Sequence, residues 1–236
     1  MNGSSKTART ILRGLAALIV VCCASPLAAL ALPVPPAMEG IDAVDIAQSL
    51  RINGVPTRVR VFATDKPLAA VLAFYRTRFG ARRVETTLKG WTVVSQRQGD
   101  LLYTARLRKA LRGTEGTVSV SDLKAGLAHL GRPLGLGLPA GSKLAVDVEM
   151  TDPGKRARVV TITNDHSVET NAAFFRAELQ SRGYRVERDL PVQRAGTQGR
   201  SLWFAAANRE AILVVSALAS GTSVVLNLIE TTDTER

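Results

Sequence analysis

The stretch VRVFATDKPLAAVLAFYRTRF at residues 59–79 has a counterpart, VVTITNDHSVETNAAFFRAEL, at residues 159–179. The two align without a gap, and Tyr75 in the first meets Phe175 in the second. Similarity within one chain at a fixed offset is typical of a repeated structural unit. Identical pairs include Asp65 and Asp165, Ala73 and Ala173, Phe74 and Phe174, and Arg76 and Arg176.

Three flanking pieces repeat in the same order. Their agreement favours duplication over a chance likeness of two amphipathic helices. The pieces are residues 43–46 (AVDI) with 145–148 (AVDV), Val84-Glu85 with Val186-Glu187, and Gly116-Thr117 with Gly221-Thr222.

Turn residues divide each copy into elements. Asn53-Gly54-Val55-Pro56 and Asp152-Pro153-Gly154 predict hairpin turns, and a helix follows each hairpin. In the first copy Asp65 is the expected helix cap, and Gly80 ends the helix. In the second copy the expected cap is Asp165 or Ser167, and the helix stops near Gly183.

Strands are predicted after each helix, at residues 91–95, 101–108, 117–121, 201–205, 211–217 and 223–229. In residues 101–108 apolar and polar side chains alternate, which indicates a sheet with one wetter face. We therefore expect an α+β fold of two tandem repeats, each a mostly antiparallel sheet with one main helix packed on one face.

The predicted turns, helices and strands, together with the N-terminal sequence, give the expected domain organisation. It consists of a signal peptide (1–31), a short segment (32–42), repeat 1 (43–121), a short helix and Gly/Pro linker (122–142), repeat 2 (143–230) and a polar tail (231–236).

The N-terminus resembles an export signal. Lys6, Arg9 and Arg13 precede an apolar run without acidic residues, and small residues near Ala29 and Ala31 offer cleavage sites. The expected location is therefore the periplasm, or the protein is otherwise exported, with the signal removed.

Two other N-terminal fates remain open. Residues 14–32 are just long enough for an uncleaved membrane anchor, which would bring membrane contact. Cys22 or Cys23 is placed where a lipidated cysteine can stand, but Val21 before Cys22 is not the usual small residue.

Composition excludes several classes of site. The only cysteines lie in the signal, so the mature chain has no disulfide, thiol nucleophile or cysteine metal site. It keeps 28 Lys and Arg against 20 Asp and Glu, a charge of +8. A basic exported chain suits anionic partners, and we expect no nucleic acid as ligand.

No catalytic, cofactor or metal constellation is found in the sequence. His129 and His166 lie far apart, and Asp165-His166-Ser167 is better explained by helix capping, because consecutive residues cannot form a triad. The Gly-Leu alternation at residues 131–139 lacks the Gly-Lys-Ser/Thr of a phosphate loop. Glu85 and Glu187 read as surface residues in ion pairs.

The candidate interaction surface consists of basic and aromatic residues. Trp91 and Trp203 fall on corresponding strands, and the densest basic cluster follows on one hairpin. The full set is Trp91, Arg106, Arg108, Lys109, Arg112 and Trp203.

The sequence thus predicts a non-enzymatic exported envelope protein. We expect an accessory or assembly factor that binds another protein of a secretion, pilus or surface-polymer system. The alternative is a periplasmic binder of an anionic small molecule or polymer, held in a cleft between the repeats. No cofactor is expected in either case.

Overall fold

The computed structural model describes residues 32–129, 132–194 and 197–232. The predicted signal peptide, with its cysteines and cleavage sites, lies outside these residues. None of the helices described is long and apolar enough to cross a membrane.

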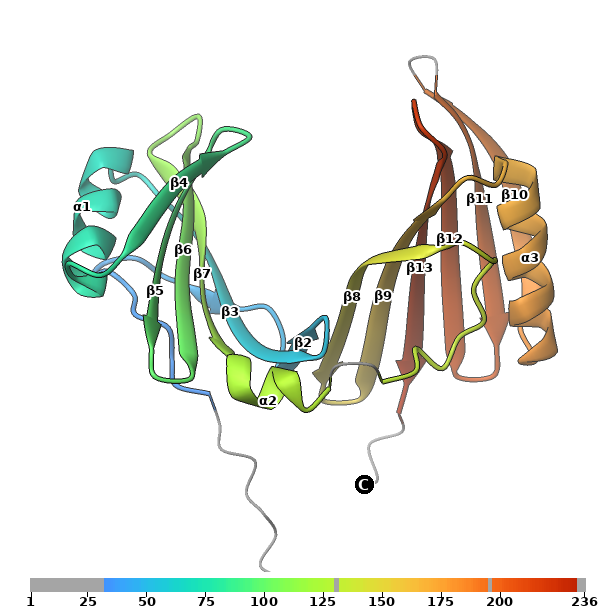
Figure 1. Cartoon of the computed structure of the whole chain (residues 1–236), viewed down its shortest axis with the longest axis horizontal. Helices are drawn as coiled ribbons and strands as arrows, with labels where there is room; N and C mark the ends of the chain where they lie inside the picture. The colour runs from blue at the N-terminus through green and yellow to red at the C-terminus, as the bar shows by residue number, and fades with distance from the viewer. Residues whose placement is uncertain (1–31, 130–131, 195–196, 233–236) are drawn as a thin grey trace, which may run out of the picture. The chain divides into compact units, whose positions relative to one another are not determined.

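The described chain forms thirteen strands and three helices (Figure 1). The strands are β1 (Val44–Asp45), β2 (Ser49–Ile52), β3 (Val55–Thr64), β4 (Val84–Leu88), β5 (Trp91–Gln98), β6 (Leu101–Lys109), β7 (Thr114–Asp122), β8 (Lys143–Asp152), β9 (Lys155–Asn164), β10 (Arg185–Arg194), β11 (Thr197–Ala206), β12 (Arg209–Ala217) and β13 (Thr222–Thr231). The helices are α1 (Leu68–Phe79), α2 (Leu123–Leu127) and α3 (Val168–Ser181).

All the strands join one sheet. Its order is β10-β11-β12-β13-β9-β8-β2-β3-β7-β6-β5-β4, with β1 paired to β3 beside this path. The predicted α+β fold of two tandem repeats, each with a sheet and a main helix of its own, is therefore wrong. The protein is mostly one 13-stranded antiparallel sheet with three helices.

The reason lies in the pairing of β2. This strand is antiparallel to β3 on one side and to β8 on the other, with Leu50 opposite Met150 and Ile52 opposite Val148. An unpaired strand edge exposes backbone donors and acceptors, and the β2–β8 ladder satisfies them. Local sequence patterns carry no signal for a pairing between strands this far apart. The predicted domain boundaries stay predictions.

The two longer helices cover one face of the sheet. Helix α1 contacts β5 and β6, and α3 contacts β10, β11 and β12 (Figure 1). The α1 core includes Val71, Tyr75, Phe79, Val94, Ala105, Leu107 and Val118. The α3 core includes Phe175, Leu179, Val160, Ile162, Leu202, Leu213 and Leu226.

The helix ends differ between the halves. The Ser167 hydroxyl accepts a hydrogen bond from the Thr170 backbone N–H, so of the two predicted caps of α3 the structure has Ser167 and not Asp165. Helix α1 instead starts after Pro67 without a side-chain cap, and the predicted role of Asp65 is wrong. Asp65 lies two residues before the cap position, whereas a capping side chain must stand at that position. Gly80 ends α1 at a φ of 72°, as predicted.

In both halves a buried threonine joins a strand to the residues just before the long helix: β7 to the start of α1, and β13 to the start of α3. Thr114 and Thr222 are buried, and their hydroxyls donate to the backbone oxygens of Lys66 and His166 at 2.8 and 2.6 Å. Gly113 and Gly221 precede these threonines. Each glycine lies close to a backbone carbonyl of the strand before the helix, at Thr64 and Asn164 respectively. The repeat pair is therefore Gly113-Thr114 with Gly221-Thr222, and the predicted match to Gly116-Thr117 is wrong by three residues.

The two halves also share an arginine–aspartate ion pair near their start. Arg58 donates two hydrogen bonds to the Asp45 carboxylate, both of 2.9 Å. Arg158 donates two to Asp147, at 2.8 and 2.7 Å. These aspartates are the equivalent residues of the AVDI and AVDV pieces, so the match between those pieces extends to side-chain contacts.

The contact at Gly113 predicts a large effect of one added methyl group. A Cβ there would lie 2.1 Å from the Thr64 backbone oxygen, at a φ of 62°. Gly113→Ala should therefore lower the free energy of unfolding by roughly 3 kcal/mol, the left-handed strain plus a backbone clash. The measurement is urea denaturation of the mature protein.

Gly99→Ala is the matched control. Gly99 has nearly the same φ, 60°, and nothing lies within 4 Å of the added Cβ. Gly99→Ala should therefore lose only the part of the free energy of unfolding that comes from left-handed backbone strain, about 1 kcal/mol. Equal losses in the two variants would contradict the close approach at Gly113.

Asp189 predicts a pH effect on stability. Its carboxylate accepts hydrogen bonds from Arg200 and from Arg176 on α3, and the Arg200 bond chiefly holds the pKa of Asp189 below its ordinary value. A lowered folded pKa adds stability above the unfolded pKa, and this stability is lost as pH falls toward the folded value. From about pH 5 to about pH 3, wild type should lose more stability than Asp189→Asn.

The matched control is Asp100→Asn, because the Asp100 carboxylate forms no ion pair within the described residues. Chemical denaturation at each pH gives the slopes, and Asp100→Asn should keep the wild-type slope. If the stability of Asp189→Asn fell with pH as steeply as that of wild type, the stabilising role of the ionised Asp189 carboxylate would be wrong.

Candidate interaction surface

The two longer helices, α1 and α3, leave the other face of β4–β7 open, and the short helix α2 contacts β6 beside it. We call this face, free of α1 and α3, the helix-free face. Val94 and Ala105 are opposite each other and buried under α1. Side chains alternate along a strand, so their neighbours Val93 and Arg106, which also pair, point to the helix-free face. Ser95 and Thr104 lie on that face too, 3.2 Å apart between hydroxyl oxygens.

The helix-free face brings together three of the predicted surface residues. The guanidinium carbons of Arg106 and Arg108 lie 4.4 and 4.3 Å from the ring centroid of Trp91. Cations over an indole face are attracted by its negative quadrupole. The arrangement holds two long cationic side chains against the indole, so cationic and aromatic groups share one small area of the face.

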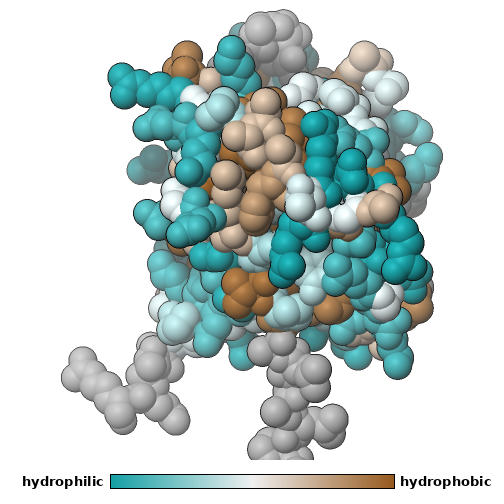
Figure 2. All heavy atoms as spheres, turned by 90° about the vertical axis from the view of Figure 1, so that its left-hand side faces the viewer, coloured by the Kyte–Doolittle hydropathy of each residue, from teal (hydrophilic) through white to brown (hydrophobic). Residues whose placement is uncertain are grey.

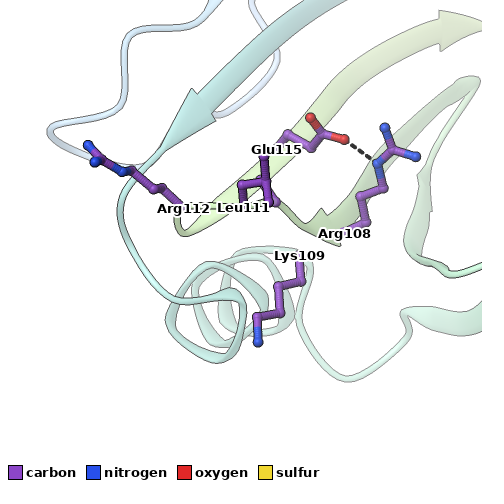
Figure 3. A pocket seen from close by; sticks show the side chains of 6 residues that line it. Arg108, Lys109, Leu111, Arg112 and Glu115 are labelled. Carbon is purple, nitrogen blue, oxygen red and sulfur yellow. Dashed lines mark hydrogen bonds and ion pairs between the residues drawn. The ribbon is translucent and has the colours of Figure 1, made fainter.

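The β6–β7 hairpin continues this basic region. Its residues 108–112 and Glu115 line an open hollow of about 680 Å³. Figure 3 shows Arg108 facing Glu115, with which it forms an ion pair, while Lys109 and Arg112 point in different directions. Leu111 at the tip is fully exposed. The basic side chains therefore do not converge on one ligand position.

Trp203 is the predicted residue that the structure does not bring to this cluster. It lies on β11 opposite Ile212 and Arg188, on the face away from α3. Eight strands separate β11 from β5 in the sheet order. The sheet gives the two tryptophans equivalent faces but not a shared site.

Sequence reasoning missed the exposed apolar residues of the helix-free face. Val84 is 69% exposed and Leu88 59%, both on β4, and Val61 on β3 is 39% exposed. On β4, the alternation of Val84 and Leu88 with Glu85 and Thr87 is the sequence signal that could have placed these two residues on one face. Val84 and Leu88 lie on the same side of one outer strand, and exposed apolar side chains that gather on a surface are characteristic of interaction sites.

The α1 side of the molecule is different. Figure 2 shows it as mostly hydrophilic atoms around a limited apolar patch. The exposed apolar residues of α1 itself include Ala69 and Ala73, which are small. Larger exposed apolar side chains of this half include Val84 and Leu88 on the helix-free face and Leu111 on the hairpin.

A second hollow, of about 570 Å³, adjoins the β2–β8 pairing. Its polar groups already bond to one another. Arg51 lies 3.0 Å from His129 Nε2, and the His129 Nδ1 lies 3.0 Å from the Ala125 backbone oxygen. Arg158 donates to Asp147 and to the Leu134 oxygen. Among the described residues, these contacts join the strands around the hollow.

Several other titratable residues have structural partners. His166 Nε2 lies 2.9 Å from the Ala140 oxygen. Arg76 donates to Glu85 and lowers its pKa, as expected for a surface ion pair. In the second half Arg176 pairs with Asp189, so Glu187 does not take the equivalent role. In the part of the chain that the structure describes, no three metal-ligating side chains cluster.

Comparison with known proteins gives little further information. No family model matches the chain, and no curated protein matches it either. One solved structure that is similar is that of the immunity protein TplEi of T6SS from Pseudomonas aeruginosa, in complex with "L" peptide. The identity is 12%, the match covers 82% of this chain and 83% of that chain, and the TM-score is 0.25. A likeness this loose carries no argument about function.

The stacking of the arginines on Trp91 predicts a fluorescence change. The chain has two tryptophans, so Trp203→Phe leaves Trp91 as the sole indole. In that background, Arg106→Ala with Arg108→Ala should uncover the ring and increase its quenching by acrylamide. The cost in unfolding free energy should be about 1 kcal/mol, since such contacts are weak at exposed sites.

Lys109→Ala with Arg112→Ala is the control of equal charge. These side chains have no contact with the Trp91 ring, so quenching should stay at the starting value. If quenching did not change in Arg106→Ala with Arg108→Ala, the stacking of these arginines on Trp91 would be contradicted.

Proposed function

We propose that this protein is a non-enzymatic, exported envelope protein that binds another protein through the helix-free face of β4–β7. The observation that carries the proposal is the Trp91 ring covered by Arg106 and Arg108, beside exposed Val84 and Leu88. On this view the protein serves as an accessory or assembly factor.

The chemistry of this face supports a protein partner. Tryptophan and arginine are enriched where protein interfaces hold most of their binding energy. The face is an open sheet surface rather than an enclosed cavity, which suits the broad contact of two proteins. Arg106 and Arg108 favour a partner surface that carries carboxylates.

An anionic small molecule is less well supported. Arg108 is already paired with Glu115, and Lys109 and Arg112 point away from one another (Figure 3). Small-ligand sites bury most of their ligand and converge a few polar groups on it. The open hollow at this hairpin has neither property.

The proposed location follows from the N-terminal sequence. The basic start and apolar run of residues 1–31 support export with removal of the signal. Mass spectrometry of the mature protein should find an N-terminus near Leu30 or Leu32, whereas a lipidated Cys22 or an intact N-terminus would support an anchored form.

Site-specific photo-crosslinking in cells tests the binding face. Thr117 pairs with both Arg106 and Val61, so a photoreactive residue there projects from the helix-free face. It should crosslink to one reproducible protein. Arg106→Glu with Arg108→Glu should weaken that crosslink at least tenfold, because the charge complementarity is reversed.

Two controls define the result. The same photoreactive residue at Ala73, exposed on α1, should give no such product. Lys124→Glu with Lys143→Glu changes the net charge equally at exposed positions elsewhere and should leave the crosslink intact. A crosslink that is equal from Ala73, or indifferent to reversal of the arginines, would reject this face as the binding site.

A further inference from the structure

The two outer strands of the sheet, β4 and β10, have different protection against pairing with another chain. An outer strand presents unpaired backbone N–H and C=O groups, and proteins normally protect such an edge with proline, bulges or charge. The comparison of the two edges shows which of them is open to a further strand.

Strand β10 carries all three protections. Pro191 lacks an N–H, and the pairing of β10 with β11 is interrupted by a bulge between Val186 and Arg188. Charged residues also occupy much of the strand, among them Arg185, Glu187 and Arg188. A further strand cannot continue regular pairing along this edge.

Strand β4 has little of this protection. Its sequence, VETTL, has no proline, and its pairing with β5 is regular from Val84 to Leu88. The only charged residue, Glu85, is bonded to Arg76 on the helix side. On the helix-free side Val84 and Leu88 are mostly exposed, so an added strand would find apolar contacts as well as backbone partners.

Positive charge stands at both ends of β4. Arg82 is exposed just before the strand, and Lys89 is exposed just after it. Within the strand the carboxylate of Glu85 is already neutralised by Arg76. An incoming segment with carboxylates at its two ends and apolar residues between them would complement this edge.

We propose that β4 is a docking edge for an extended acidic segment of the partner protein, which adds to the sheet as a further antiparallel or parallel strand. The inference rests on the proposed function and deepens it by naming how the partner binds and which chemistry it carries. The neighbouring helix-free face then contacts the rest of the partner.

A second copy of this chain is a poorer occupant. If two β4 strands paired antiparallel about Thr86, Val84 would face Leu88, and Arg83 would face Lys89 twice. Like charges directly opposite each other in a sheet are destabilising. The basic ends therefore favour an acidic partner over self-association.

The test uses NMR of the mature protein with a blocked peptide, acetyl-Glu-Val-Thr-Val-Thr-Val-Glu-amide, as the probe. At millimolar concentration it should shift the backbone amide signals of β4 and slow their hydrogen exchange, while the β10 signals stay unchanged. A peptide with Lys in place of each Glu should bind at least tenfold more weakly. A peptide with Pro at the central Val should not protect β4.

Charge reversal on the protein completes the test. Arg82→Glu with Lys89→Glu should lower the affinity for the acidic peptide at least tenfold, and Lys124→Glu with Lys143→Glu, equal in charge, should not. No shift in β4, equal binding of the Lys peptide, or β4 protection that appears with protein concentration alone would each overturn the proposal, the last in favour of a second copy.

The two proposals fail in different ways. If the crosslink from Thr117 persists in Arg82→Glu with Lys89→Glu and no peptide binds β4, the helix-free face binds a partner and the docking edge is wrong. If the Thr117 crosslink is also absent in wild type, the proposed function itself is wrong.

Discussion

The structure depends on the fact that both long helices pack on the same face of one sheet. Helix α1 buries Val94, Ala105 and Leu107, and α3 buries Leu202 and Leu213 in the corresponding way. Since strand side chains alternate, every strand that supports the core must also present a second set of residues to the opposite face. The helix-free face is thus a consequence of how the core is made.

The composition of that second face differs from that of a sheet face that is only solvated. A sheet face that needed only to be wet would carry short polar side chains, as the pair Ser95 and Thr104 does. Around Trp91 the same face carries a large aromatic ring, two stacked guanidinium groups and exposed Val84 and Leu88. These side chains expose more apolar and cationic surface than the fold requires, which is why we place partner binding there.

Much of the local structure could be predicted from sequence. The helices, the Asn53-Gly54 turn and the cap at Ser167 follow from short-range rules, and the structure contains all of them. The errors arose where short-range rules compete with tertiary contacts. Asp65 has the chemistry of a cap but the wrong position, and the repeat match near residue 116 missed the buried contact of Thr114 with the Lys66 oxygen.

The sequence by itself showed a repeated pattern at a fixed offset, the alternation of strand faces and the concentration of basic residues on β6 and its hairpin, because each is a property of neighbouring residues or of a fixed spacing. The tertiary structure alone decided that β2 pairs with β8 into one sheet, that Trp91 lies under Arg106 and Arg108 while Trp203 does not join them, and that β4 is an outer strand. Backbone hydrogen bonds are nearly independent of side-chain identity, so the choice of strand partner is made by the packing of the whole chain.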